Sequence, residues 1–385
     1  MKKTFTFVLL TLQAIWVMGQ NKPEDDKFKL GVNGRIYFDG GVFFKDTARL
    51  SRGVSISDLR IGIKGSMEKW YGKIDIGYAK SSISFKDIFL QYNIDKSSYM
   101  RIGHFAEPFG IDRMETSYAV KFLTPNAASQ AFAPGRSLGI EYIGWGDLTW
   151  YAAGVFGDAN AHKAKKAGAE GYAGTLRFVI NPVREAGKIL HIGSAVSFRK
   201  ADLTGLDNAN RDRPRLITYS ANAESVIEPR KFIRADINDA KYQNKEAVEL
   251  IGALGRFHIQ SEYFRTRVKR EDSETNETYK ARGFYVQGGY LLSGKAYEYA
   301  PEWARMKLPA AGSLELVIRY SWVNLNHTAS NIMGGKQDDT TIGVNYYIKK
   351  NMAFKLHYTN VGLDRNSSIG RQRFNSLQGR LAVMF

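Results

Sequence analysis

An alternation of apolar and polar residues runs along most of this chain. Between Phe28 and Asp39, apolar residues and glycine alternate without a break with polar positions such as Lys29, Asn33 and Arg35. A period of two residues places the two sets on opposite faces of one β-strand. The segment is therefore predicted to be a strand with one apolar and one polar face.

The same pattern returns in many further segments. Alternating segments lie near 58–67, 74–78, 88–92, 100–105, 138–143, 190–199, 314–320, 342–348 and 354–358, and less regular ones near 148–156, 172–180, 246–254, 256–267, 281–292 and 374–385. Strands of about ten residues that alternate apolar-out and polar-in are typical of transmembrane β-barrels. We therefore expect an all-β fold, an antiparallel transmembrane β-barrel of about 16 strands, with loops folded into its lumen.

The lengths of the connections support a barrel with two different ends. The gaps near 39–54, 106–136, 158–171, 200–245, 269–280, 324–339 and 361–373 are long, and those near Lys69, Asp95, Trp145, Gly255 and Lys350 are tight. Outer-membrane barrels have short turns at the periplasmic end and long loops outside, and counting strands puts the two kinds of gap at opposite ends. The stretch from Gly294 to Gly312 is the exception, because it is long and falls at the short-turn end.

The N-terminus has the layout of a secretory signal peptide. Basic residues are followed by an apolar run from Phe5 to Met18 and by the small residue Gly19, and this run is too short to span a bilayer as a helix. We expect a signal peptide over residues 1–19 and one barrel domain over 20–385, the alternative being an N-terminal membrane anchor. After Gly19 no window has the roughly twenty consecutive apolar residues of a transmembrane helix.

Charge and composition narrow the function classes. The formal net charge is +17, which favours anionic partners, and export argues against nucleic acid. Anionic lipid or lipopolysaccharide at the rim and small anions in the lumen remain. With no cysteine, no clustered metal ligands and no nucleophile motif around any of the six histidines, we expect no metal, no cofactor and no enzymatic activity. An outer-membrane hydrolase or adhesin on the same barrel is the alternative from another class.

One long connection carries the candidate pore chemistry. Two alternating segments, at 100–105 and 138–143, flank about thirty residues that include Arg113, Lys121 and Arg136. A connection this long inside a compact domain is usually functional. We expect it to lie inside the barrel and narrow it, with Lys121 and Arg136 at the narrowest point and Arg113 behind them.

Further basic residues are expected to line the path. Alternation points five arginines inward: Arg35, Arg60, Arg101, Arg319 and Arg380. Three more are spaced by two in the gap 200–245, so that one face of an extended segment could present them all: Arg211, Arg213 and Arg215. Cationic side chains in a constriction select anions, and the planar fork of arginine suits oxyanions such as phosphate. The alternative for each wall arginine is an ion pair with an inward acid such as Asp39, Asp58, Asp75 or Glu315.

Several stretches resemble the phosphate-selective porin O/P family of Gram-negative outer membranes. They are GRIYFD at 34–39, SDLRIGIKG at 57–65, RIGHFAEPFG at 101–110, AFAPGRSLGIEY at 131–142, AAGVFGD at 152–158, GFYVQGGYLLSG at 283–294, LELVIRYS at 314–321 and TIGVNYYI at 341–348. They follow one another in order over nearly the whole mature chain. The block from Gly103 to Gly139 is the most specific of them.

The resemblance implies a sixteen-stranded homotrimeric porin in the outer membrane. It implies that the third loop, the fifth loop and the long turn from Gly294 to Gly312 fold into the lumen. It also implies that the barrel assembly machinery recognises the terminal strand ending in Phe385. Lys295 departs from the family pattern, in which an acidic residue commonly follows the glycine at this position. The expected function is a passive, anion-preferring channel for phosphate or similar small oxyanions, with a non-specific general porin as the alternative.

Overall fold

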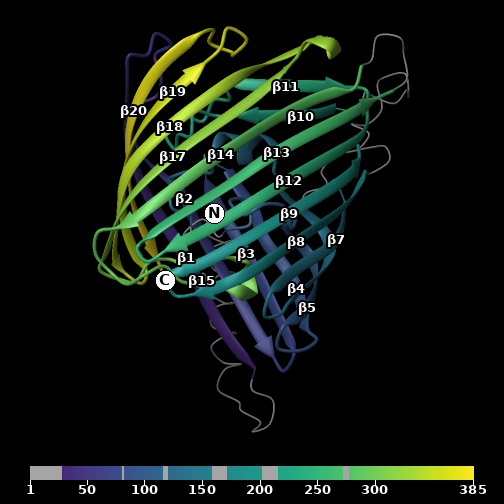
Figure 1. Ribbon diagram of the computed structural model, residues 1–385, viewed down its shortest axis with the longest axis vertical. Coiled ribbons are helices and arrows are strands. Elements are labelled where there is room, and N and C mark those ends of the chain that lie inside the picture. The colour runs from purple at the N-terminus through teal and green to yellow at the C-terminus, as the bar shows by residue number, and fades with distance from the viewer. Residues whose placement is uncertain (1–27, 80–81, 116–119, 158–170, 202–215, 272–276) are drawn as a thin grey trace, which may run out of the picture.

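The computed structural model describes residues 28–79, 82–115, 120–157, 171–201, 216–271 and 277–385. Sixteen antiparallel strands form one closed barrel, as Figure 1 shows, which confirms the predicted fold class and strand number. Two short two-stranded sheets, β10–β11 and β15–β16, lie outside the order of the barrel strands. Among the described residues, no helix has the length and apolar character needed to cross a membrane.

The barrel strands follow the chain order from β1 to β20. They are β1 (Lys29–Phe44), β2 (Gly53–Met67), β3 (Trp70–Ala79), β4 (Ser82–Asn93), β5 (Ser98–Ala106), β6 (Arg136–Trp145), β7 (Thr149–Gly157), β8 (Tyr172–Glu185), β9 (Lys188–Lys200), β12 (Ala240–Leu254), β13 (Phe257–Arg270), β14 (Tyr279–Leu291), β17 (Ser313–His327), β18 (Ile332–Lys349), β19 (Met352–Leu363) and β20 (Gln372–Met384). The other elements are α2 (Ala127–Phe132), β10 (Leu216–Ala221), β11 (Ile233–Asn238), β15 (Tyr299–Ala300), η1 (Pro301–Trp303), β16 (Arg305–Met306) and η2 (Thr328–Ser330).

Each strand has an apolar outer face and a polar inner face. Ile61 and Ile342 are more than half exposed on the outside, whereas Arg60 and Thr341, each one position away along the chain, are buried on the inside. Alternate side chains of a strand point to opposite faces, so one register fixes the orientation of every residue. The sequence alternation therefore predicted correctly which face of each strand is polar.

The two ends of the chain close the barrel. Strand β1 pairs with β20 over the ten residues from Arg35 to Phe44. Beyond this ladder, Gly34 and Phe385 exchange two backbone hydrogen bonds of 2.8 and 3.0 Å. The Phe385 ring lies where a Cβ atom at Gly34 would be, only 2.3 Å from the nearest ring carbon, so a larger residue at 34 would displace the terminal ring. Closure leaves neither strand with a bare edge.

Two loops fill one side of the barrel interior. The third loop (residues 107–135) carries helix α2, and the fifth loop (residues 201–239) forms the β10–β11 hairpin near one mouth (Figure 1). Phe132 of α2 packs on Tyr219 of β10 and on Phe264 of the β13 wall. These rings belong to the largest buried apolar cluster of the described residues. Burying such side chains stabilises by about 1.5–3 kcal/mol each, so the two loops and the wall hold one another in place.

The long turn at the short-turn end (residues 292–312, the inward turn) also packs inside the barrel. Its Tyr297, Tyr299 and Met306 cluster with Ile189 and Ile251 of the inner wall. The Trp150 indole N–H donates to the Glu302 carbonyl oxygen at 3.3 Å. This arrangement agrees with the inward fold that the family resemblance implies.

Two parts of the fold were not predicted. The gap expected near 324–339 is mostly strand. Strand β17 continues to His327 and β18 begins at Ile332, so that η2 lies in the short connection between them. The gap expected near 200–245 contains β10, β11 and the first residues of β12. The alternation of Ile233, Ala235 and Ile237 was available in the sequence, but these residues face the loop core rather than lipid.

Candidate functional site

A wide cavity lies inside the barrel against β1–β6. It has a volume of about 1130 Å³ and is bounded by these strands, the third loop and the inward turn. Nine basic side chains line it: Arg35, Arg60, Lys64, Lys73, Arg101, Arg113, Arg136, Arg305 and Lys350. Four acidic side chains do so: Glu68, Asp75, Asp87 and Glu115. The side-chain lining is therefore strongly positive.

The wall arginines of this cavity are held by acids. Arg35 Nη2 lies 2.5 Å from Asp58 Oδ2, and Arg101 Nη1 lies 3.3 Å from Glu141 Oε1. Arg60 faces Asp75 at the longer distance of 3.8 Å. Pairing fixes each guanidinium in a defined direction and compensates part of its charge. These wall arginines thus line the cavity, as predicted, and at the same time form the ion pairs that were the alternative.

Aromatic rings further orient Arg101. Its guanidinium carbon lies 4.1 Å from the centre of the Phe89 ring and 5.0 and 5.4 Å from those of Tyr99 and Phe105. A cation over a ring face is attracted by the ring quadrupole. All three rings line the cavity beside the guanidinium, which is therefore held against an aromatic wall.

Of the predicted arginines that the structure describes, the most accessible lies in the third loop. Arg113 is exposed to the lumen and has no salt bridge or hydrogen bond to any described residue. It also lines a smaller cavity of about 100 Å³, together with Arg136 and Arg380. Arg136 Nε donates to Asp87 Oδ1 at 2.7 Å, and about a third of its side chain stays exposed. Three predicted arginines therefore meet between the third loop and the barrel wall.

Glu115 lies among these cations and lines both cavities. Burial, reinforced by the nearby Asp112 carboxylate, raises the pKa of Glu115 to about 8, although Arg305 and Lys121 act in the opposite direction. At neutral pH this side chain is therefore mostly uncharged. The loop then adds little negative charge beside Arg113.

The backbone of the third loop is locked by glutamate. Glu262 of β13 accepts hydrogen bonds from the N–H groups of Ile111 and Asp112, at 2.7 and 3.1 Å. Gly110 has φ +77°, and a Cβ atom there would lie 2.4 Å from Glu262 Oε1. Only glycine combines this backbone conformation with so close an approach. Gly110, the last residue of the stretch GHFAEPFG at 103–110, thus helps to set the position of Arg113.

Lys121 and Arg319 do not line the described cavities. Lys121 is buried, and its Nζ lies 2.6 Å from Glu315 Oε1. Arg319 is also buried and donates through Nε and Nη2 to Glu224 of the fifth loop, at 3.0 and 2.5 Å. Both residues tie loops to the inner wall. The position of Lys121 at the narrowest point of the pore stays a prediction.

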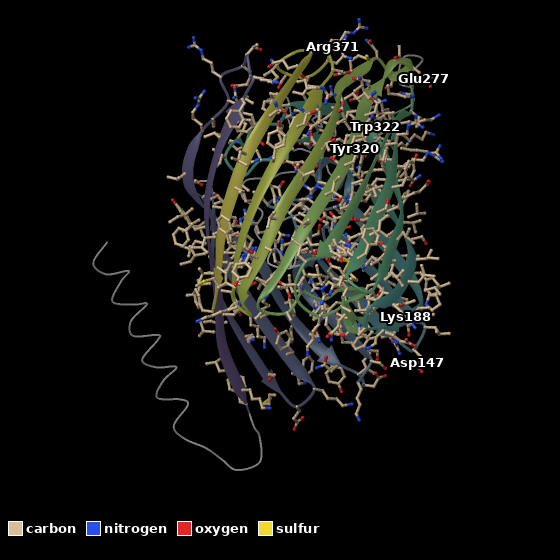
Figure 2. All side chains as sticks on the ribbon, turned by 60° about the vertical axis from the view of Figure 1, so that its left-hand side comes forward. Asp147, Lys188, Glu277, Tyr320, Trp322 and Arg371 are labelled. Carbon is tan, nitrogen blue, oxygen red and sulfur yellow. The ribbon has the colours of Figure 1, made fainter. Side chains whose placement is uncertain are left out.

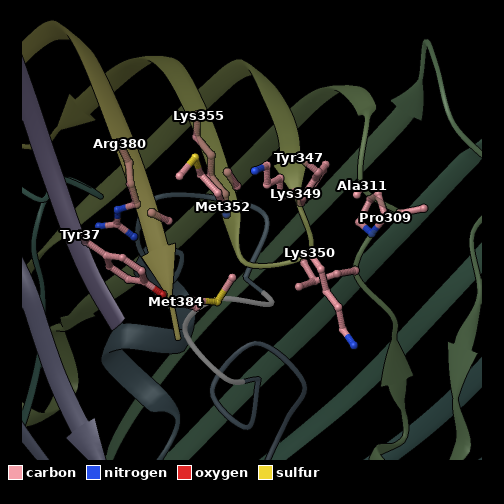
Figure 3. A pocket seen from close by; sticks show the side chains of 14 residues that line it. Tyr37, Pro309, Ala311, Tyr347, Lys349, Lys350, Met352, Lys355, Arg380 and Met384 are labelled. Carbon is pink, nitrogen blue, oxygen red and sulfur yellow. The ribbon is translucent and has the colours of Figure 1, made fainter. Parts of the chain in front are cut away.

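Of the remaining predicted residues, the structure describes Arg380 but not the three arginines of the fifth loop. Arg380 forms two hydrogen bonds with the Asp39 carboxylate, at 2.7 and 2.9 Å, and lies 4.3 Å from the centre of the Tyr37 ring. It borders a cavity of about 300 Å³ next to the inward turn, where Figure 3 shows it near Tyr37 and Lys355. Arg211, Arg213 and Arg215 lie outside the described residues.

Several cations of the lumen were not among the predicted residues. Strand alternation placed Lys64 and Lys355 on the polar face, so the sequence held a signal for both. Lys355 donates from Nζ to the Val120 carbonyl oxygen at 2.5 Å. Arg305 belongs to the inward turn, and its guanidinium carbon lies 5.5 Å from the centre of the Trp303 ring. No strand pattern marks Arg305, because the turn reaches the lumen only through its tertiary fold.

The histidines and acids that the structure describes do not form a metal site. Among the described residues, no group of three or more His, Asp or Glu side chains is arranged to hold a metal ion. The buried His191 instead makes hydrogen bonds of 2.7 Å to the Tyr299 hydroxyl group and 3.0 Å to Glu249 Oε1. The basic lumen is therefore the candidate site.

Comparisons with known proteins agree with this geometry. The family model "Phosphate-selective porin O and P" matches residues 32–385. Porin O of Pseudomonas aeruginosa is 23% identical over 89% of this chain and 84% of its own length.

Solved structures share the fold at low identity. The anion-selective porin from Comamonas acidovorans is 10% identical, with a TM-score of 0.58, and the match covers 93% of this chain and 100% of that one. The outer membrane channel DcaP of Acinetobacter baumannii is 13% identical, with a TM-score of 0.58 and coverages of 95% and 99%. OmpT of Vibrio cholerae in a trimer form is 13% identical, with a TM-score of 0.55 and coverages of 93% and 99%. With a closed sixteen-stranded barrel and a family match over nearly its whole length, this chain belongs to the phosphate-selective porin O and P family of outer-membrane proteins.

Proposed function

We propose that this porin is a passive channel that prefers small anions, phosphate-like oxyanions among them. The observation that carries the proposal is the cavity beside β1–β6, lined by nine basic and four acidic side chains. The names of Porin O's family and of the anion-selective porin from Comamonas acidovorans point in the same direction.

The proposed path uses two kinds of cation. The wall arginines Arg35, Arg60 and Arg101 are partly compensated by acids and set a fixed positive field. Arg113 is accessible to solute, and we assign it the first direct contact with a passing anion. Low-dielectric walls concentrate the field of such charges, which raises the local anion concentration. The guanidinium fork can then bind two oxygens of a phosphate-like ion.

The test is the reversal potential of the purified protein in a planar bilayer under a KCl gradient. Anion preference is the expected result for the wild type, and cation preference would overturn the proposal. A unit charge about 6 Å away in water contributes about 0.7 kcal/mol. Reversing it in Arg113→Glu changes the energy of each ion by about 1.4 kcal/mol, in opposite directions for anions and cations, so the ratio of anion to cation permeability should fall by about a hundredfold. Lys188→Glu, at the short-turn end and lining none of the described cavities, is the matched control and should leave the ratio unchanged.

A second measurement addresses oxyanion specificity. Single-channel conductance in chloride should fall as inorganic phosphate is titrated in, because a bound phosphate excludes chloride from the path. Conductance that follows only bulk ion composition would support the general-porin alternative. The proposal includes no catalytic activity, and a folded protein that fails to conduct would favour the hydrolase or adhesin class.

The proposal extends to assembly and export. We propose a homotrimer, supported by the family match and by the trimer form of Vibrio cholerae OmpT. We also propose that residues 1–19 are removed as a signal peptide and that the barrel assembly machinery recognises the terminal strand. Mass spectrometry of the mature protein, and its oligomeric mass in detergent, would test the first two points.

A further inference from the structure

The outer wall carries a row of basic side chains at the long-loop end of β13, β14 and β18. The row, named here the basic belt, consists of five residues: Arg265, Arg267, Lys280, Arg282 and Lys336. All five occupy outward positions of their strands, and all except the half-buried Arg267 are exposed. They do not line the pore cavities described above, so the selectivity of the lumen does not explain them.

The strand register brings like charges face to face. Arg265 lies directly opposite Arg282, and Arg267 directly opposite Lys280. Directly opposite residues have Cβ atoms only about 4.5–5.5 Å apart, and like charges in such pairs are destabilising. Two successive pairs of this kind therefore favour the binding of an anion beside them.

The protein supplies little compensation. Glu246 of β12 lies directly opposite Arg265, and its Oε1 is 3.7 Å from Arg267 Nη2, with both side chains substantially exposed. One acid therefore offsets part of the charge of two arginines. Among the described residues, Arg265, Lys280 and Arg282 have no salt-bridge partner. Arg282 and Lys336 instead converge on the Trp322 ring, at 5.8 and 5.6 Å from its centre. Two cations of the belt, from β14 and β18, thus meet at one ring.

The height of the belt on the barrel identifies its surroundings. One outward position closer to the barrel middle lies a row of aromatic residues, with Phe284 opposite both Tyr263 and Trp322. Figure 2 shows Tyr320 and Trp322 on the same side of the barrel as Glu277 and Arg371, away from Asp147 and Lys188. Aromatic girdles mark the interface between the apolar band and the headgroups. The belt therefore lies at headgroup depth, on the side of the long loops.

We propose that the basic belt binds phosphate groups of lipid headgroups in the outer leaflet. Two guanidinium groups on facing strands can each present a fork to the oxygens of one phosphate. The long stems of Arg265 and Lys280 can extend along the apolar wall and keep their charges at the interface. Binding would relieve the repulsion that the strand register imposes.

The experiment compares the wild type with the double variant Arg265→Gln and Arg282→Gln in neutral detergent. Diphosphorylated lipid A is added, and the unfolding temperature is followed by loss of the β-sheet circular dichroism signal. We expect this lipid to raise the unfolding temperature of the wild type and to raise that of the variant much less. The lipid concentration that gives half of the rise should be at least tenfold higher for the variant. Without lipid, the variant should be as stable as the wild type or more stable, because a like-charge pair is gone.

Three further measurements test whether lipid-bound phosphate and the basic belt are both needed for the effect. Phosphate-free lipid A should have little effect on the wild type, and so should inorganic phosphate at matched concentration. A matched control, Arg184→Gln with Lys188→Gln at the opposite end, should respond to diphosphorylated lipid A as the wild type does. Equal responses to phosphorylated and phosphate-free lipid, an equal response to free phosphate, or an unchanged response of the double variant would each overturn it.

Pore selectivity separates this proposal from the one above. The belt faces outward, so the double variant should retain the wild-type reversal potential. This readout also shows that the variant has folded and assembled.

Discussion

Glu115 shows how a single acid can tune a positive lumen. Because burial and Asp112 raise the pKa of Glu115 to about 8, its carboxyl group is mostly protonated at neutral pH. It ionises as the pH rises through about 8, which adds a negative charge to the cavity that Arg113 and Arg305 also line. We expect the anion preference, measured as a reversal potential, to fall between pH 7 and pH 9.

The variant Glu115→Gln isolates this contribution. Its anion preference should match that of the wild type near pH 6, where Glu115 is neutral, and should lose the part of the pH dependence that Glu115 causes. A variant that titrates as the wild type does would assign the effect to other groups of the lumen.

Lys121 illustrates the other fate of a loop cation. It is buried against Glu315, which also accepts hydrogen bonds from the Tyr297 and Tyr347 hydroxyl groups at 2.6 and 2.8 Å. Removing one partner of a buried ion pair leaves an uncompensated charge and costs about 3–5 kcal/mol. Lys121→Met should therefore lower the free energy of unfolding by about this amount, measured by denaturant titration in detergent.

An exposed ion pair provides the control. Lys307 and Glu298 are paired at 3.0 Å, with about half of each side chain exposed. Surface pairs contribute about 0–1 kcal/mol, so Lys307→Met should have little effect on stability. A large loss in Lys307→Met, or none in Lys121→Met, would contradict the distinction drawn between them.

At the scale of elements, one glutamate joins two loops to the wall. Glu224 of the fifth loop accepts hydrogen bonds from Arg319 and Ser321 of β17 and from the N–H of Ala127, the first residue of α2. The fifth loop, the third loop and the wall therefore share a single carboxylate. Removing the Glu224 carboxylate should therefore free both loops from the wall at once.

We expect Glu224→Ala to increase open-channel noise and the frequency of subconductance states in single-channel recordings. The matched control is Asp236→Asn in β11, whose partner Arg234 lies on the same exposed hairpin strand at 2.7 Å. Its recordings should resemble those of the wild type. Quiet, wild-type-like recordings of Glu224→Ala would show that other contacts suffice to hold the loops.

At the scale of the whole molecule, the lumen is an electrostatic filter whose range depends on salt. The Debye length falls from about 10 Å at 0.1 M to about 3 Å at 1 M ionic strength. Ions that enter the lumen screen the field of its basic lining in the same way. The ratio of anion to cation permeability should therefore decrease steadily between 0.1 and 1 M KCl, and a ratio independent of salt would indicate selection by pore size rather than by charge.

The sequence by itself determined the barrel. A period of two residues dictates strands with one face for lipid and one for water, and alternating gap lengths dictate which end is which. For this reason the strand number and the inward direction of Arg35, Arg60 and Arg101 could be predicted. The family membership was predicted separately, from the stretches that resemble the family.

Only the tertiary structure decided what the inward and loop cations do. Lys121 and Arg113 belong to the same basic loop, yet one is sealed in a buried pair with Glu315 and the other is exposed to the lumen. The partner of Lys121 is distant in the sequence, and no local period encodes this pairing. The same holds for Arg305, which the inward turn brings to the cavity, and for the basic belt, whose like charges meet only because the register of β13 and β14 places them opposite one another.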